Sequence, residues 1–311
     1  MRIHWLLLVL AGLAAGGEAA AQNRDRSYPP ELPDAEAVVY KQAGDVELKL
    51  WLFRPEGHKP AEQRPASVFF FCGGWRSGTP SQFVPQCRYL ASRGMVAATA
   101  DYRVSSRHGV TADKCVQDAK SAIRYLRSHA AELGIDPERI AAGGGSAGGH
   151  LAACTGVVTG FEESAEDENV SSRPNLMVLF NPALVLAPVG KETPKLEARL
   201  SELGARLGVD DPAVLSPYHT VGAGQPAAIV FHGKADSTVD YRTAELFAEA
   251  MKKAGNACEL VGYEGEGHGF FNYGRGGNSG YRDTLRRMDL FLAAHGYLEG
   301  EPTGEAAEKT E

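Results

Sequence analysis

The sequence has few cysteines and no pattern that would make them into a metal or redox site. It contains five cysteines in 311 residues, and no two of them form a Cys-x-x-Cys pair. Local zinc and thiol redox sites usually depend on such pairs, so neither is indicated. Because the number is odd, at least one cysteine is free or bonded to another chain. We expect small buried side chains with at most one or two disulfides, of undetermined pairing, among Cys72, Cys87, Cys115, Cys154 and Cys258.

The chain also lacks an excess of basic residues. Lys and Arg total 32 against 39 Asp and Glu, which gives a formal net charge of -7. A general nucleic-acid binder needs a basic face that displaces counterions from phosphates, so this class is excluded. Hydrophobic residues make up 43%, which excludes a fully disordered chain.

Long hydrophobic runs are absent except at the amino terminus. Trp5 to Ala15 is an apolar run after a short positive start, and Ala19-Ala20-Ala21 supplies small residues suited to a signal peptidase. The run is too short for a transmembrane anchor, which needs about 20 apolar residues. We therefore expect a signal peptide over residues 1–21, a secreted or periplasmic protein without stable membrane insertion, and a flexible polar arm over residues 22–36.

What the chain does contain is an alternation of apolar strands and amphipathic helices. Val46 to Phe53 alternates apolar and charged residues, which predicts one strand of a hairpin with the run at 37–42. Ala66 to Cys72 is continuously apolar, as in a strand buried on both faces. Similar runs occupy 95–100, 140–143, 176–180, 227–231 and 258–263, and helical periodicity occupies 112–131, 241–254 and 281–295. This order predicts one α/β domain over 37–297 with a mostly parallel sheet.

Three segments interrupt that rhythm. Phe161 to Arg173 is polar and acidic, and we expect a solvated surface loop. Asn181 to Gln225 is long for one connection and contains a predicted helix near Lys195 to Leu207, so we expect an insertion that caps a site. Residues 298–311 are charged and without apolar periodicity, which predicts a disordered acidic tail.

The chemistry is concentrated where predicted strands end. Gly144-Gly145-Ser146-Ala147-Gly148 matches Gly-x-Ser-x-Gly, in which a strand turns sharply into a helix and projects the serine hydroxyl. A predicted strand precedes this motif and a predicted helix follows it. A phosphate loop would need Gly-Lys-Ser or Gly-Lys-Thr, which is absent here. Ser146 is therefore the candidate nucleophile.

A serine needs a base, and the base needs an acid, in the chain order Ser, Asp, His. His268 lies in a glycine-rich loop directly after the last predicted strand and is the candidate base. His219, His232 and His295 lie in the insertion, at a strand end and at a helix end, respectively.

The candidate acid is Asp236, in the loop that follows the strand 227–231. Asp240 is the competitor, but it precedes a predicted helix, where a carboxylate more often complements the helix dipole.

Acyl transfer also requires amides that stabilise the oxyanion. One is expected from Ala147, directly after the candidate nucleophile. The others are expected from Gly73 and Gly74, in a glycine-rich loop after the early buried strand.

Together these motifs resemble the α/β-hydrolase superfamily, and within it the bacterial acetyl-esterase, feruloyl-esterase-like and hormone-sensitive-lipase-like serine esterases. The resemblance covers about residues 37–297 and implies a twisted, mostly parallel sheet with helices on both faces and a small cap. The sequence departs from the family at Phe71 and Cys72, where a His and a Gly are usual before the two glycines. Gly145 stands where the hormone-sensitive-lipase branch usually has Asp, which favours the acetyl- and xylan-esterase-like proteins.

The resemblance implies a secreted serine carboxylesterase that needs no metal or organic cofactor. Its expected substrates are short-chain esters, possibly acetyl groups on carbohydrate. One alternative is a prolyl-oligopeptidase-like peptidase, but the polar arm is too short for the propeller those enzymes carry. The other is an inactive hydrolase fold used for binding, which the presence of Ser146, Asp236 and His268 disfavours.

Overall fold

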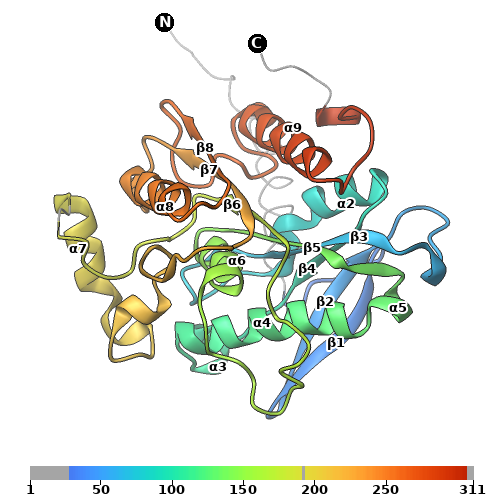
Figure 1. The fold of residues 1–311 in the computed structure, drawn as a ribbon, viewed down its shortest axis with the longest axis horizontal. Helices are drawn as coiled ribbons and strands as arrows, with labels where there is room; N and C mark the ends of the chain where they lie inside the picture. Colours follow the sequence, from blue (N-terminus) through green and yellow to red (C-terminus); the bar gives the residue numbers. More distant parts are fainter. Residues whose placement is uncertain (1–27, 191–192, 307–311) are drawn as a thin grey trace, which may run out of the picture.

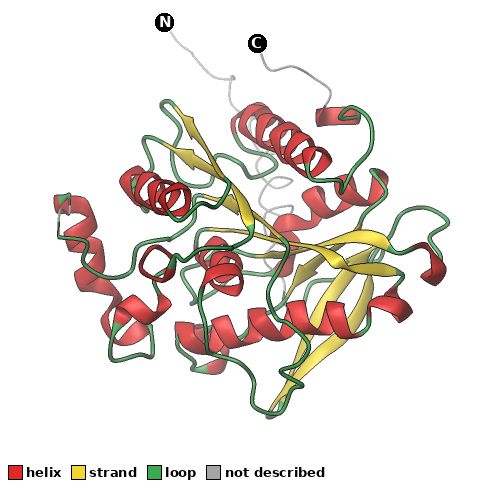
Figure 2. Ribbon diagram, in the orientation of Figure 1, coloured by secondary structure: helices red, strands yellow, loops and turns green. Residues whose placement is uncertain are grey.

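A single mixed sheet organises the chain in this computed structural model, which describes residues 28–190 and 193–306 (Figures 1 and 2). In these residues eight strands pair in the order β1-β2-β4-β3-β5-β6-β7-β8. The pairs β1–β2 and β2–β4 are antiparallel, and every other pair is parallel. The strands are β1 (Glu36–Ala43), β2 (Val46–Phe53), β3 (Arg64–Phe70), β4 (Val96–Ala100), β5 (Ile135–Gly145), β6 (Leu176–Phe180), β7 (Ala227–Gly233) and β8 (Cys258–Tyr263).

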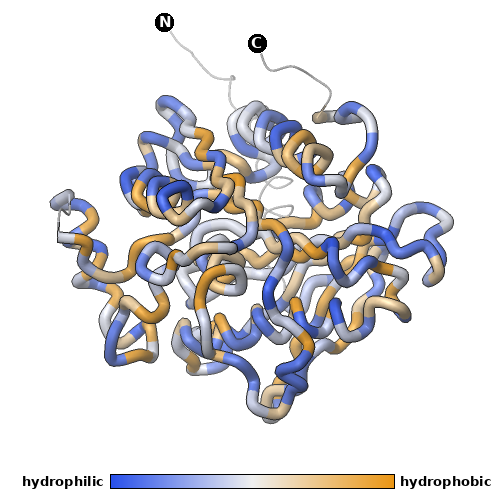
Figure 3. Tube along the Cα trace, viewed as in Figure 1, coloured by the Kyte–Doolittle hydropathy of each residue, from blue (hydrophilic) through white to orange (hydrophobic). Residues whose placement is uncertain are grey.

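Helices cover both faces of this sheet, as the sequence predicts. One core cluster joins the sheet to α4, α6 and α8, and the other joins it to α2 and α9. Figure 3 shows hydrophobic segments running through the central sheet. The helices are α2 (Val84–Ser92), α3 (Ser105–His108), α4 (Ala112–Ser128), α5 (Ala130–Leu133), α6 (Ala147–Val157), α7 (Pro194–Leu203), α8 (Tyr241–Lys253) and α9 (Ser279–Ala294). Short 3-10 turns are η1 (Pro60–Glu62), η2 (Pro80–Phe83), η3 (Gly204–Arg206), η4 (Pro212–Leu215), η5 (Pro217–Thr220), η6 (Gly276–Asn278) and η7 (Gly304–Ala306).

The predicted cap is a helix and a chain of short turns. Its helix α7 begins at Pro194, with the Thr193 hydroxyl accepting a hydrogen bond from the Leu196 amide. Turns η3, η4 and η5 then return the chain to β7. The element stands at one side of the domain, next to α8 and α6 (Figure 1).

The predicted flexible arm is wrong for residues 28–36. The Tyr28 hydroxyl donates to Asp101 Oδ2 at 2.5 Å, and the Arg107 guanidinium lies 3.7 Å from the centre of the Tyr28 ring. Leu32 packs against the core and Asp34 forms an ion pair with Arg88. Long-range contacts that sequence periodicity does not reveal therefore fix this segment. The predicted signal peptide, with the arm's first residues, lies outside the described residues.

The predicted disordered tail is likewise wrong as far as residue 306. Leu298, Pro302 and Ala306 are buried, and Arg93 donates to the carbonyls of Glu299 and Gly300. Apolar side chains four residues apart thus cover the core beside α9, although charged neighbours mask them in the sequence. Residues 307–311 lie outside the described part.

The acidic loop at residues 161–173 is held against the domain by ion pairs, so the prediction of a solvated surface loop is wrong. Glu162 pairs with both Lys120 and Arg124 on α4, whose side chains are buried. Glu166 also binds Arg124, and Glu163 binds Lys41. The buried cations need these carboxylates, since an unpaired buried charge is costly.

All five cysteines are free thiols, so no disulfide of the kind allowed for in the sequence is present. Four are buried, and Cys72 is half-buried. In the described residues no helix is both long enough and apolar enough to cross a bilayer.

Candidate active site

Ser146 stands at the abrupt turn between β5 and α6. Its backbone has φ 53° and ψ -116°, a conformation that residues other than glycine seldom adopt. The Ser146 amide donates to Phe180 O of β6 at 2.9 Å, which ties the turn to the neighbouring strand. A Cβ at Gly148 would lie 2.0 Å from Phe70 O, so the motif needs glycine there because β3 passes so close. The turn predicted from Gly-x-Ser-x-Gly is therefore present.

The carboxyl ends of parallel strands place the three candidate residues at one edge of the sheet. Ser146 follows β5, Asp236 lies in the loop after β7, and His268 lies in the loop after β8. Nδ1 of His268 and Oδ2 of Asp236 are 2.7 Å apart, within hydrogen-bond distance. The structure thus brings together the histidine and the acid selected from the sequence.

Asp236 is buried and is held as a carboxylate by several donors. Its Oδ1 accepts from the amides of Thr238 at 2.7 Å and Val239 at 2.9 Å, and its Oδ2 also accepts from Asn181 Nδ2 at 2.5 Å. Burial by itself would raise the pKa of Asp236. The hydrogen bond and positive charge of His268, with the donors from Val239 and Asn181, outweigh burial and lower that pKa to about 2. Asp236 is therefore ionised at neutral pH.

Asn181 is a site residue that sequence reasoning missed. It directly follows β6, is fully buried, and adopts φ 42°, an uncommon backbone conformation for a residue with a side chain. Its amide nitrogen must face Asp236, because a carboxylate can only accept hydrogen bonds. The available signal is its place at a strand end, where the sequence predicts the first residue of the cap.

The other histidines have structural partners. His219 contacts Ser216 Oγ and Pro188 O, and His295 contacts Phe291 O. Neither bonds to the Asp236–His268 pair.

His232 lies behind the site rather than within it. It is fully buried, with Nε2 at 3.1 Å from Val239 O and 3.5 Å from Asp236 Oδ2. Burial lowers the pKa of His232, which keeps it neutral. Asp240, the competing acid, accepts from the Arg242 amide at the start of α8 and from the Thr193 hydroxyl, as expected for a helix cap.

The glycine-rich loop after β3 has a backbone that exposes its amides. Gly73, Gly74 and Trp75 have φ of 125°, 60° and 60°. A Cβ at Gly73 would lie 1.9 Å from Ser77 O, so only glycine fits. Among the described residues, the amides of Gly73 and Gly74 donate to no other group. The amide of Ala147, the first residue of α6, has no partner within its helix.

The two departures in this loop have structural explanations. Phe71 stacks on Tyr102 with ring centres 4.1 Å apart, and the Tyr102 hydroxyl donates to Phe71 O. The Cys72 amide donates to Gln82 Oε1 at 2.7 Å, and Gln82 Nε2 contacts both Cys72 Sγ and Asn272 Oδ1. An aromatic stack and a glutamine bridge thus support the loop.

The Ser146 hydroxyl makes no hydrogen bond to His268 or to any other described residue. Ser146 is nevertheless close to the histidine loop, because a Cβ at the preceding Gly145 would lie 2.6 Å from the ring of Phe271. Catalytic hydrogen bonds are often long without substrate and shorten when it binds.

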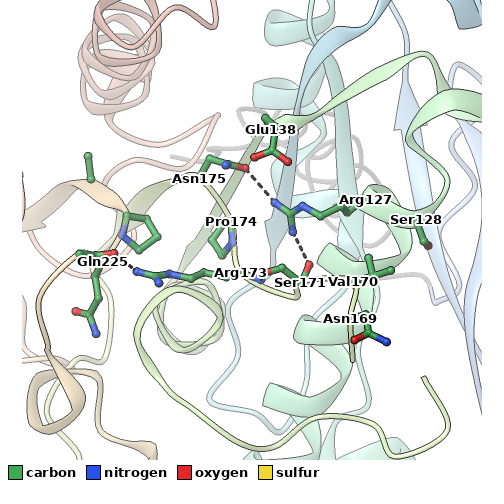
Figure 4. A pocket seen from close by; sticks show the side chains of 13 residues that line it. Arg127, Ser128, Glu138, Asn169, Val170, Ser171, Arg173, Pro174, Asn175 and Gln225 are labelled. Carbon is green, nitrogen blue, oxygen red and sulfur yellow. Dashed lines mark hydrogen bonds between the residues drawn. The ribbon is translucent and has the colours of Figure 1, made fainter. Parts of the chain in front are cut away.

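Three of the hollows among the described residues border different parts of the fold. A pocket of about 170 Å³ is lined by His268, Glu266 and Arg275, and a narrow apolar cavity of about 30 Å³ lies between α7 and Trp75. A broad polar hollow of about 850 Å³, which includes Arg127 and Asn175, borders the amino ends of β6 and β7 (Figure 4). It is therefore at the opposite edge of the sheet from Ser146.

Comparison with known families identifies the group to which this site belongs. Residues 52–251 match the BD-FAE family, and residues 214–296 match the dienelactone hydrolase family. The chain belongs to the BD-FAE family. Both matches agree with the α/β-hydrolase fold, and with an esterase of the type related to hormone-sensitive lipases, that the motifs imply.

Esterases of known structure and sequence resemble the chain over most of its length. Thermogutta terrifontis esterase 2 is 56% identical, with a TM-score of 0.83, over 88% of this chain and 100% of that one. Its structures include forms phosphonylated by sarin and forms with propionate or butyrate bound. The carboxylesterase NlhH of Mycobacterium tuberculosis is 26% identical over 82% of each chain.

A probable isoprenylcysteine alpha-carbonyl methylesterase of Arabidopsis thaliana is 29% identical over 66% of this chain, which spans 45% of that protein's length. The chain thus covers about half of the plant relatives it matches. The esterase relatives and the covalent organophosphate adducts of the Thermogutta enzyme support a serine ester hydrolase that acts on carboxylic esters.

Proposed function

We propose that the chain is a serine carboxylesterase in which Ser146 is the nucleophile, His268 the general base and Asp236 the group that orients the base. The observation that carries the proposal is the hydrogen bond between His268 Nδ1 and Asp236 Oδ2 at the sheet edge where Ser146 occupies its left-handed turn. This bond leaves Nε2 of the imidazole as the nitrogen available to the serine proton.

The reaction follows from these positions. Ser146 Oγ attacks the ester carbonyl as His268 takes its proton, and the carbonyl oxygen becomes an anion. The amides of Ala147, Gly73 and Gly74 donate to that anion. His268 then returns the proton to the leaving alcohol. Water, deprotonated by His268, releases the carboxylic acid from the acyl-enzyme and restores Ser146.

The substrates we propose are esters of short carboxylic acids. Propionate and butyrate bound to the Thermogutta esterase support this size class. Acetyl esters of carbohydrate are a natural substrate within this class if the chain is exported, as the apolar run at its amino terminus suggests.

The test is hydrolysis of p-nitrophenyl acetate, butyrate, octanoate and palmitate by the wild type and by Ser146→Ala. We expect kcat/KM to fall steeply beyond butyrate, and the variant to lose at least about 10³-fold. Ser128→Ala is the matched control, since Ser128 is exposed at the opposite edge of the sheet. Equal rates for the wild type and Ser146→Ala would refute the proposal.

A further inference from the structure

Each of the three loops of the proposed site accepts a hydrogen bond from a cationic side chain. Each side chain donates a hydrogen bond to a backbone carbonyl, and the three carbonyls belong to the amide-bearing loop, the acid loop and the histidine loop. The three bonds are Arg206 Nη2 to Gly74 O at 2.9 Å, Arg275 Nη1 to His268 O at 3.0 Å, and Lys195 Nζ to Asp236 O.

These three cations are not neutralised by ion pairs. Among the described residues, no carboxylate lies within ion-pair distance of Lys195, Arg206 or Arg275. A carbonyl accepts a hydrogen bond but carries no net charge, so the positive charge remains available. Elsewhere cations are typically paired, as Arg242 is with Glu245 and Glu249. Unpaired cations at one place are therefore notable in a chain whose net charge is -7.

Two further arginines, Arg199 and Arg76, lie near these cations. Arg199 lines the cavity between α7 and Trp75, together with Lys195. Burial lowers the pKa of Arg206, the positive charges of Arg199 and Arg76 lower it further, and the negative charge of Glu202 opposes this with a smaller effect. These guanidinium groups are thus close enough to repel one another.

The acidic side chains nearby compensate only part of this charge. Glu202 pairs with Arg199, but its side chain is 65% exposed, where an ion pair contributes little. Asp240 accepts hydrogen bonds from Thr193 and from the start of α8. Glu266 lines the pocket beside His268 without reaching Arg275 as an ion pair. The cap as a whole, over the described residues 181–190 and 193–225, carries four carboxylates against three cations, but none of these carboxylates lies within ion-pair distance of Lys195 or Arg206.

We propose that this site selects carboxylic esters that carry a negatively charged group close to the scissile bond, with Arg199 and Arg206 as its binding residues. This inference rests on the proposed esterase function and narrows its substrate class. Guanidinium groups bind carboxylate and sulfate oxygens through paired hydrogen bonds, and a positive rim also raises the local concentration of an anionic substrate. Such a ligand would supply the ion-pair partner that Arg206 lacks.

The experiment compares 4-acetoxybenzoate, which is anionic, with its neutral methyl ester. The wild type should show a kcat/KM for the anion that falls several-fold between about 20 mM and 500 mM salt, because ions screen the attraction. The neutral ester should be nearly insensitive to salt. The ratio of the two kcat/KM values should fall about three- to tenfold in Arg199→Gln/Arg206→Gln.

Two variants separate charge from loop support. Arg206→Lys keeps the charge but alters the contact with Gly74, so it should preserve the anionic-to-neutral ratio even where both rates fall. Arg242→Gln removes a cation on α8 that is paired, and it should leave the ratio unchanged. Using 4-acetoxybenzenesulfonate in parallel shows whether a sulfonate replaces the carboxylate.

The outcomes distinguish this inference from the function on which it rests. If wild type hydrolyses both esters with the same salt dependence, or if the ratio survives Arg199→Gln/Arg206→Gln, the anion selectivity is wrong and the esterase stands. If neither ester is hydrolysed by the wild type, or if Ser146→Ala hydrolyses both equally well, the proposed function itself fails.

Discussion

The indole Nε1 of Trp75 donates a 3.2 Å hydrogen bond to Nδ1 of His150. His150 Nε2 in turn lies 2.8 Å from Leu215 O, a carbonyl of the cap. Since Nδ1 accepts, the imidazole must be neutral with its proton on Nε2. Burial lowers the pKa of His150 to about 4, which keeps this tautomer at neutral pH. One buried histidine on the helix after Ser146 thus links the amide-bearing loop to the cap.

This link predicts that His150 positions the oxyanion amides. Trp75 holds a left-handed backbone next to Gly74, and its bond to His150 fixes the indole. His150→Phe should lower kcat about tenfold with little change in KM, because misplaced amides stabilise the transition state less. His150→Gln, which can both accept and donate, should recover part of kcat. Steady-state kinetics on p-nitrophenyl butyrate measures both.

His150→Phe also leaves the Trp75 N–H and Leu215 O without partners, which should cost about 2 kcal/mol or more of stability. Thermal unfolding measures this cost. If the variant unfolds at a lower temperature but keeps its kcat, His150 contributes only to stability and the positioning role is wrong.

Asn181 should determine the pH dependence of the reaction. Its Nδ2 donates to the same Asp236 oxygen that bonds His268. Without that donor the carboxylate attracts the proton on His268 more strongly, so the acid limb of the kcat/KM profile moves to higher pH. Asn181→Ala should show this shift together with a loss of roughly tenfold in kcat.

The control is Asn169→Ala, which removes an exposed side chain that lines the hollow at the opposite edge of the sheet. A pH profile of Asn181→Ala that superimposes on that of wild type after scaling would contradict the role assigned to Asn181.

Asp101 should make the protein less stable as pH rises. It is 2% exposed, and burial raises its pKa to about 6 despite the hydrogen bond from Tyr28. The folded state therefore binds this proton more tightly than the unfolded state does. The resulting stabilisation is full below about pH 4 and is lost as pH rises through about 6, at a cost of up to about 3 kcal/mol.

Asp101→Asn removes this titration and keeps an oxygen for Tyr28. Urea unfolding at a series of pH values should show that the free energy of unfolding of the variant rises relative to that of the wild type between about pH 4 and pH 8. A difference between the two proteins that is constant with pH, or that changes in the opposite direction, would show that Asp101 does not titrate in this range.

The sequence alone located the strands and both ends of the Asp236–His268 hydrogen bond. Each depends on local information, since an apolar run marks a buried strand and the catalytic loops of this fold follow strand ends in a known order. The first half of β5 shows what such local information misses. Residues 135–139 are mostly polar, and this half of the strand pairs with β3 only through Arg64.

The contacts that escaped sequence reasoning join residues far apart in the chain. The sequence predicts a surface loop at Glu162, because nothing local marks Lys120 and Arg124 as buried cations that need this carboxylate. Asn181 bonds Asp236 across 55 positions, and the amide of a strand-end asparagine has no distinctive local pattern. Tertiary packing, rather than periodicity, decides both.

The central claim is that Ser146 is the nucleophile activated by His268. Its most direct test is reaction with a fluorophosphonate, followed by intact mass measurement and peptide mapping. We predict one phosphonyl group per chain on the peptide that contains Ser146, no label on Ser146→Ala, and labelling slowed by at least about 10²-fold in His268→Ala. Labelling of another residue, or an unchanged labelling rate in His268→Ala, would contradict the account.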